Sequence, residues 1–157
     1  MRKTRDILYT IFMGLILFIS GAIILGGIEY FIYSYIGIDF VSVIIFFILA
    51  RFLTNLVLKG IESRGLFYSI YLPLMVVVMF LLKDYVFFLV YYILGGVNVF
   101  SILAFIPQLM LDRLITTFIY SSEVGVGNYI LNLLSFIVDV IILIIGVYQS
   151  YKITKYR

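Results

Sequence analysis

Four charged side chains stand inside long apolar stretches of the sequence and are the first candidates for chemistry. They are Arg51, Asp112, Arg113 and Asp139. A charge in hydrocarbon costs a few kcal/mol or more, so such residues pair with one another, face water or bind a ligand. Two cations and two anions at a similar depth would form one neutral polar layer.

Amide side chains recur at helical distances from these charges. Asn55 follows Arg51 by four residues, and Gln108 precedes Asp112 by the same distance. Residues four or seven positions apart share one face of a helix. The spacing predicts inward polar faces on three helices, which together form a buried polar or substrate-binding network of Arg51, Asn55, Gln108, Asp112, Arg113, Asn132 and Asp139.

Three roles stay open for this network. It could hold the helices together by ion pairing, or it could line a cavity for a polar solute, an ion or a proton. In the third role, Asp112 and Asp139 would share a proton and activate water. The chain lacks the Asn- and Gly-containing motifs around the paired aspartates of small lipoprotein signal peptidases, which disfavours catalysis. Glu29 stands apart, near the outer end of the first apolar stretch, where it could either reach the interface by snorkelling or line a vestibule.

The residue types that are missing exclude several kinds of chemistry. The chain has no cysteine and no histidine. This excludes thiol catalysis, Ser-His-Asp triads, zinc sites built on Cys or His, and histidine-ligated haem. There is also no Gly-rich phosphate loop and no nucleic-acid-binding signature. We therefore expect no metal, no cofactor, no nucleic-acid partner and no enzymatic activity.

The composition predicts the elements that must position these residues. Of the 157 residues, 65% are hydrophobic and 12% are charged. A soluble domain is roughly half apolar and about one quarter charged. Lipid must therefore be the solvent, and we expect an all-α integral membrane protein with a single transmembrane domain, residues 1–157.

The apolar stretches give the candidate spans. A helix needs about 20 apolar residues to cross the hydrocarbon core. Residues 7–33, 40–58 and 129–147 are clear candidates, and residues 66–82 are a shorter one. Residues 85–120 form either one span followed by an interfacial helix or two tilted spans.

The distribution of cations favours six spans. The N-terminal tail, residues 59–65 and the C-terminal tail carry three, two and three cations, whereas the expected outer loops 34–39, 83–84 and 121–128 carry one. Cytoplasmic flanks are enriched in Lys and Arg. We therefore predict a bundle of six transmembrane helices in the cell membrane, with both termini cytoplasmic; four or five spans are the alternatives.

The sequence predicts a class of function rather than a reaction. We expect a non-catalytic membrane subunit that binds partner proteins, captures a small solute, or does both within a larger complex. The alternatives are a self-sufficient carrier or channel acting as an oligomer, and an intramembrane hydrolase that uses Asp112 and Asp139. The expected partners are the lipid bilayer, another membrane protein or a second copy, and a cytoplasmic protein at residues 59–65 or the C-terminal tail.

Overall fold

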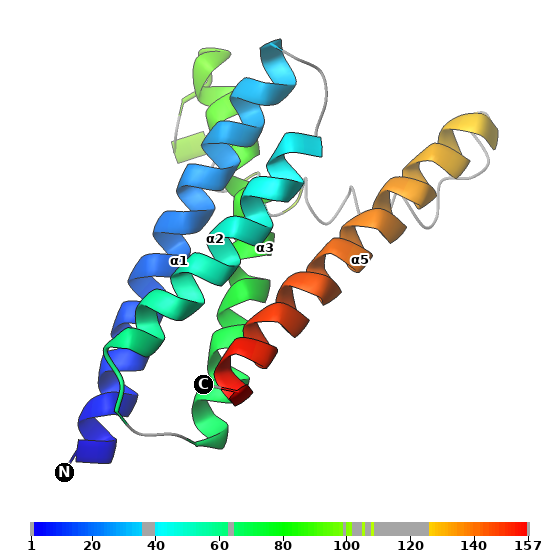
Figure 1. The fold of residues 1–157 in the computed structure, drawn as a ribbon. Helices are drawn as coiled ribbons and strands as arrows, with labels where there is room; N and C mark the ends of the chain where they lie inside the picture. The colour runs from blue at the N-terminus through cyan, green and yellow to red at the C-terminus, as the bar shows by residue number, and fades with distance from the viewer. Residues whose placement is uncertain are drawn as a thin grey trace.

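Four long helices make up the described part of the chain. The structure is a computed structural model that describes residues 2–35, 40–62, 65–98, 100, 101, 105, 108 and 126–156. Within these residues there is no strand. The helices are α1 (Arg2–Tyr35), α2 (Phe40–Lys59), α3 (Leu66–Leu94) and α5 (Val126–Tyr156) (Figure 1).

Each of the four helices is long and apolar enough to cross a membrane. The criterion is length and composition, since about 20 apolar residues span the hydrocarbon core. The predicted all-α fold and the predicted membrane class are confirmed to this extent. The three clear candidate spans of the sequence correspond to α1, α2 and α5.

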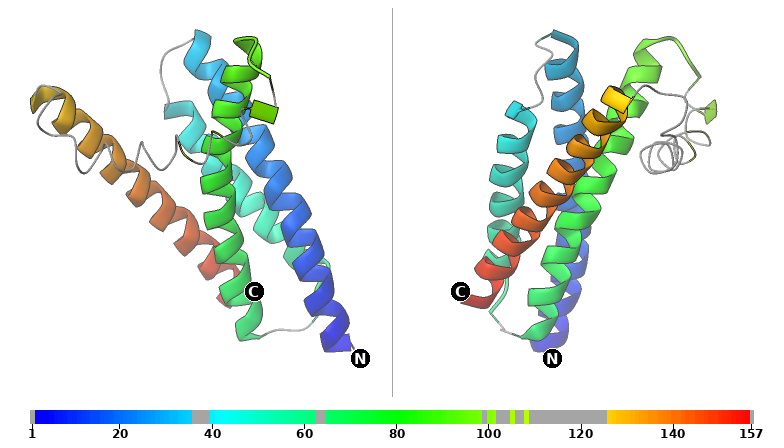
Figure 2. Two further views of the ribbon diagram at one scale, coloured as in Figure 1. Left: turned by 180° about the vertical axis from the view of Figure 1, so that it is seen from behind. Right: turned by 90° about the vertical axis from the view of Figure 1, so that its right-hand side faces the viewer.

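The helices are arranged as a group of three with one helix crossing it. Helices α1, α2 and α3 lie side by side, while the N-terminal end of α5 leans away from them (Figures 1 and 2). Helix α1 packs most extensively against α3, and α5 contacts α3 and α2. Both termini lie at the same end of the bundle (Figure 1), which is called the terminal end below.

The core is built from side chains that recur at helical spacing. On α1, Phe18, Ala22 and Leu25 are buried, at i, i+4 and i+7, which places them on one face of the helix. Helices α2, α3 and α5 contribute the remaining buried apolar residues, which are Phe46, Ala50, Leu53, Val57, Leu72, Met75, Val76, Met79, Phe80 and Ile142. The core therefore joins all four helices.

Small residues on α1 let α3 approach closely. A Cβ atom at Gly26 would lie 2.5 Å from the backbone oxygen of Lys83, and one at Gly14 would lie 2.8 Å from the ring of Tyr71. The Tyr71 hydroxyl donates a hydrogen bond of 2.9 Å to the Ile11 carbonyl oxygen across the same interface. Small residues drive helix contact in membranes, because lipid offers no hydrophobic force between helices.

The C-terminal half of α5 is attached to the bundle by a glycine and a hydroxyl pair. A Cβ atom at Gly146 would lie 2.7 Å from the Phe46 ring, so the two helices touch there. Thr54 on α2 donates its hydroxyl proton to the Ala50 carbonyl at 2.7 Å. Its oxygen lies 3.0 Å from Ser150 Oγ, so Ser150 is the donor of the bond that joins α5 to α2.

The structure corrects one boundary predicted from the sequence. Residues 83 and 84 were expected to form an outer loop between two spans, but α3 continues through them as one helix of 29 residues. This prediction is wrong because Lys83 is paired with Glu29 and Asp84, so its charge is compatible with a continuous helix. Helix α3 ends instead at Leu94, with Gly95 as its C-cap, followed by Gly96 at φ 81, a left-handed conformation that favours glycine. The division of this stretch into two spans is therefore not observed.

Candidate functional site

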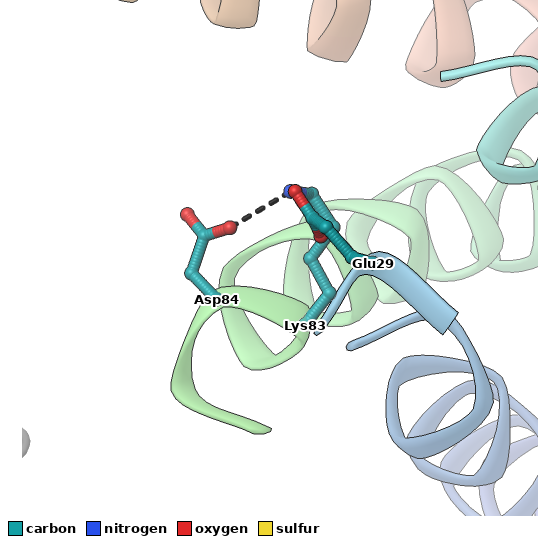
Figure 3. Close-up of polar contacts among 3 residues, drawn as sticks. All are labelled: Glu29, Lys83 and Asp84. Carbon is teal, nitrogen blue, oxygen red and sulfur yellow. Dashed lines mark hydrogen bonds and ion pairs between the residues drawn. The ribbon is translucent and has the colours of Figure 1, made fainter. Parts of the chain in front are cut away.

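Three charged side chains meet at the end of the bundle away from the termini. Lys83 Nζ on α3 donates hydrogen bonds of 3.0 Å to both carboxylate oxygens of Glu29 on α1. It donates a third, of 2.8 Å, to Asp84 Oδ1. Figure 3 shows the ammonium group between the two carboxylates. An ammonium has three N–H donors, so all the donors of Lys83 are used.

These three residues, called the charge clamp below, lie largely out of contact with solvent. The side chains of Lys83, Glu29 and Asp84 are 11%, 14% and 31% exposed. The Lys83 ammonium also lies 4.9 Å from the centre of the Phe80 ring, where a cation is attracted to the aromatic face. Two carboxylates share one ammonium, which bridges α1 and α3 through Glu29 and stays on α3 through Asp84. Asp84 is the more exposed of the two carboxylates.

The charge clamp lies about one bilayer thickness along α1 and α3 from the start of their apolar runs. A helix rises about 1.5 Å per residue, so about 30 Å measured from Ile7 ends near Gly27, and the same length from Leu66 ends near Val86. Glu29 and Lys83 stand within a few residues of these points. A charge at this level of the helices is expected to cost less free energy than a charge in the middle of a span. The cost is still large enough that the carboxylate and the ammonium stabilise each other by pairing.

Aromatic side chains surround the same level of the bundle. The Tyr30 ring lies 6.1 Å from the Phe87 ring and 6.4 Å from the Tyr91 ring, which joins α1 to α3. Aromatic residues concentrate at membrane–water interfaces, where one end of the side chain is apolar and the other wet. These contacts support the placement of the charge clamp at an interface. The vestibule expected at Glu29 stays a prediction.

The predicted polar network is described only in part. Asp112 and Arg113 lie outside the described residues. Gln108 is exposed, and Asn132 lies on α5. Asp139 is half-buried on α5 and has an interaction partner. The predicted joint role of these residues therefore stays a prediction.

Arg51 is placed differently from the expectation. Its side chain is exposed on α2 rather than buried between helices. The ion pairs that the structure gives within its described part join Arg5 to Asp6 and Lys83 to Glu29 and Asp84. The Asn55 side-chain amide donates a hydrogen bond of 2.9 Å to the backbone carbonyl oxygen of Arg51. This bond therefore does not involve the Arg51 guanidinium.

Sequence reasoning missed Lys83 and Asp84 as members of a site. Two adjacent charges in an apolar run were interpreted as a turn at the membrane surface. The available signal was that Lys83 was the single cation of the expected outer loops, while Glu29 was a lone carboxylate within an apolar stretch of the sequence. A buried carboxylate needs a cation, and Lys83 was the available one at that end.

The chain matches no protein-family model, and neither a curated protein nor a solved structure is similar to it. The class of protein is therefore defined by the fold and the site alone. The chain is a helical membrane protein in which an ion-pair clamp and close glycine contacts fasten α1 to α3.

Proposed function

We propose that this protein is a non-catalytic subunit of a larger membrane assembly, and that it binds a partner protein within the bilayer. One observation carries the proposal. Arg51 is exposed on the outer surface of α2, in the middle of a candidate span that runs from Val41 to Lys59.

The contact between Tyr9 and Gly60 supports a central depth for Arg51. Gly60 lies directly against the ring of Tyr9, near the terminal end of α1. Arg51 is nine residues before Gly60, which corresponds to about 13 Å along the helix axis. Because the hydrocarbon core is about 30 Å thick, the backbone of Arg51 lies near its middle.

An arginine at this depth needs a counterpart. The helical Cα–Cβ bond tilts toward the helix N-terminus, so the Arg51 side chain starts toward Phe40 and away from the cation-rich end. Insertion measurements place the cost of a central arginine at about 2.5–3.5 kcal/mol. Lys83 shows how this chain treats a buried cation, because it is enclosed by two carboxylates. A partner protein can offer Arg51 the equivalent contact.

The substitution Arg51→Met tests the proposal. Truncating one partner of a buried charge pair costs about 2–5 kcal/mol of binding, so we expect at least a tenfold loss of the co-purifying protein. The measurement is quantitative mass spectrometry after affinity purification in mild detergent. The control is Leu74→Met, an exposed position on α3. Repeated recovery of the wild-type chain alone would contradict the proposal and favour a self-sufficient carrier or channel.

We further propose that the terminal end of the bundle faces the cytoplasm of the cell. The cations Lys3, Arg5, Lys59, Lys152 and Lys155 belong to the chain ends and to the end of α2 that lies beside Tyr9, and all five are exposed. Positive charge is retained on the cytoplasmic side during insertion. The same exposed end is where a cytoplasmic partner would dock, at residues 59–65 or the C-terminal tail.

Labelling of single cysteines tests the orientation, because the natural chain contains no cysteine. Glu62 is exposed near the terminal end, and Val97 is exposed just after α3 at the other end. An impermeant maleimide added to intact cells is expected to label Val97→Cys, and to label Glu62→Cys only after the membrane is opened. The reverse pattern would place the termini outside.

Two other expectations keep their status as predictions. Capture of a small solute depends on the predicted polar layer, of which Asp112 and Arg113 lie outside the described residues. The intramembrane hydrolase requires Asp112 beside Asp139 and depends on the same part of the chain.

A further inference from the structure

The outer face of α2 carries an apolar stripe with one cation in it. Ile44, Ile48 and Phe52 are 46%, 62% and 58% exposed, and Arg51 is exposed beside them. Positions 44, 48, 51 and 52 follow each other at i, i+4, i+7 and i+8, which places them on one side of a helix. These four residues are called the α2 face below.

We propose that the α2 face binds a transmembrane helix of a different protein, and that this helix carries an Asp or Glu side chain at the depth of Arg51. The inference rests on the proposed function, because it specifies the chemistry of the partner that function requires. A guanidinium presents its N–H donors in a fork that matches the two oxygens of a carboxylate. A carboxylate would also neutralise the charge, which a neutral acceptor cannot do.

The apolar neighbours of Arg51 favour a helix as the occupant. Ile48 and Phe52 lie on either side of it along the helix axis and offer large apolar surfaces at the same depth. Backbone groups within hydrocarbon must satisfy their hydrogen bonds internally, so an occupant at this depth is helical. Packing against Ile48 and Phe52 would also remove lipid and water from the ion pair and strengthen it.

As far as its described residues go, a second copy of this chain is a poor occupant. A twofold contact through the α2 face would place one Arg51 against the other, because both subunits use the same patch. Among the described carboxylates, Glu29 and Asp84 are bound to Lys83 at the opposite end, and Asp6 and Glu62 lie near the terminal end. Asp139 already has an interaction partner.

Lipid headgroups are also poor occupants for Arg51. Long cationic side chains reach the interface by snorkelling when they stand near the end of a helix. Arg51 is ten residues from Val41 and eight from Lys59, which corresponds to about 15 Å and 12 Å along the axis. Both distances exceed the length of the side chain.

A zero-length cross-link tests the proposal directly. The variant Arg51→Lys keeps the positive charge and supplies an amine that can form an amide with a carboxylate in contact with it. Native membranes that contain this variant are treated with dicyclohexylcarbodiimide, which enters the bilayer and activates carboxylates. The position of each new amide is then found by peptide mass spectrometry. The wild-type chain is the matched control, since a guanidinium does not form this amide.

The charge clamp provides an internal standard for the same reaction. Lys83 lies 3.0 Å from Glu29 and 2.8 Å from Asp84, so an intramolecular amide is expected at Lys83 in both proteins. Its formation shows that the reagent has reached carboxylates inside the bundle and that the variant has folded.

We expect position 51 of the variant to be joined to an Asp or Glu within a transmembrane segment of another protein. A link to a second copy of this chain, to another residue of the same chain or to a lipid carboxylate would overturn the proposal. An amide at Lys83 with none at position 51 would overturn it as well.

A photoreactive residue separates this inference from the proposed function. It is placed at Ile48 on the α2 face or at Leu74 on α3, both of which are exposed. Cross-linking to a protein from position 48 but not from position 74 supports the α2 face. Cross-linking from position 74 alone keeps the proposed function and overturns the inference, and a partner captured from neither position counts against both.

Discussion

Replacing Lys83 with methionine is expected to lower the free energy of unfolding by about 3–5 kcal/mol, which is the usual cost of removing one partner from a buried ion pair. The substitution keeps an unbranched apolar side chain in place and removes the charge that holds Glu29 and Asp84. The two carboxylates would then face each other with no cation between them. Denaturant titration of the purified protein in detergent, followed by circular dichroism, measures the loss.

Variants of Glu29 distinguish an ion-pair effect from a packing effect. Glu29→Gln should cost less than Lys83→Met, because Asp84 still pairs with the ammonium at 2.8 Å. The double variant Glu29→Gln, Lys83→Met should lose less free energy of unfolding than the two single variants lose together. The reason is that it leaves fewer uncompensated charges than Lys83→Met alone. Additive losses across the cycle would show that the charge clamp does not couple α1 to α3.

Gly26→Ala is expected to destabilise the protein by about 1–3 kcal/mol, the typical cost of forcing an extra methyl group into a packed interior. The new Cβ atom would lie 2.5 Å from the backbone oxygen of Lys83 and 2.8 Å from the Cβ atom of Val86. Backbone cannot move aside as a flexible side chain can, so α1 and α3 must separate. The same denaturant titration measures the change.

The neighbouring glycine is the matched control. A Cβ atom at Gly27 would meet nothing within 4 Å. Alanine is favoured over glycine in a helix by about 1 kcal/mol, so Gly27→Ala should leave stability unchanged or raise it. Equal losses for the two alanine variants would mean that α1 and α3 do not pack as closely at Gly26 as the structure places them.

Sequence alone was sufficient for the class of protein and for most of the spans. The reason is physical: the thickness of the bilayer imposes uninterrupted apolar runs, and such runs are visible in one sequence. The predicted starts of α2 at Phe40 and of α3 at Leu66 agree with the structure.

The orientation of Arg51 could not be predicted in the same way. In a soluble helix, the polar face and the apolar face differ, so the direction of each residue follows from the pattern. Helix α2 is apolar on both sides, with Phe46 in the core and Ile48 exposed. The sequence therefore contains no contrast that assigns Arg51 to one side, and the expectation of an inward position was an assumption about charges.

The partnership of Glu29 and Lys83 was hidden by distance along the chain. The two residues are separated by 54 positions and by the whole of α2. Their charges are complementary, but a single sequence does not show which helices become neighbours. The ion pair becomes apparent only when α1 and α3 are known to be in contact. Without that contact, Lys83 and Asp84 have the sequence pattern of a surface loop.

The charge clamp and the Gly26 contact act on the same turn of α3, and together they fix its register. Sliding α3 by one helical turn along α1, about 5.4 Å, would separate Lys83 from Glu29. The same shift would move the backbone of Lys83 away from Gly26, where the absence of a side chain allows the close approach. The ion pairs of the charge clamp and the close packing at Gly26 thus oppose the same displacement. We therefore expect α1 and α3 to move as one rigid unit. In a rearrangement of the folded protein, α1 and α3 are expected to keep their relative position while other elements move against them.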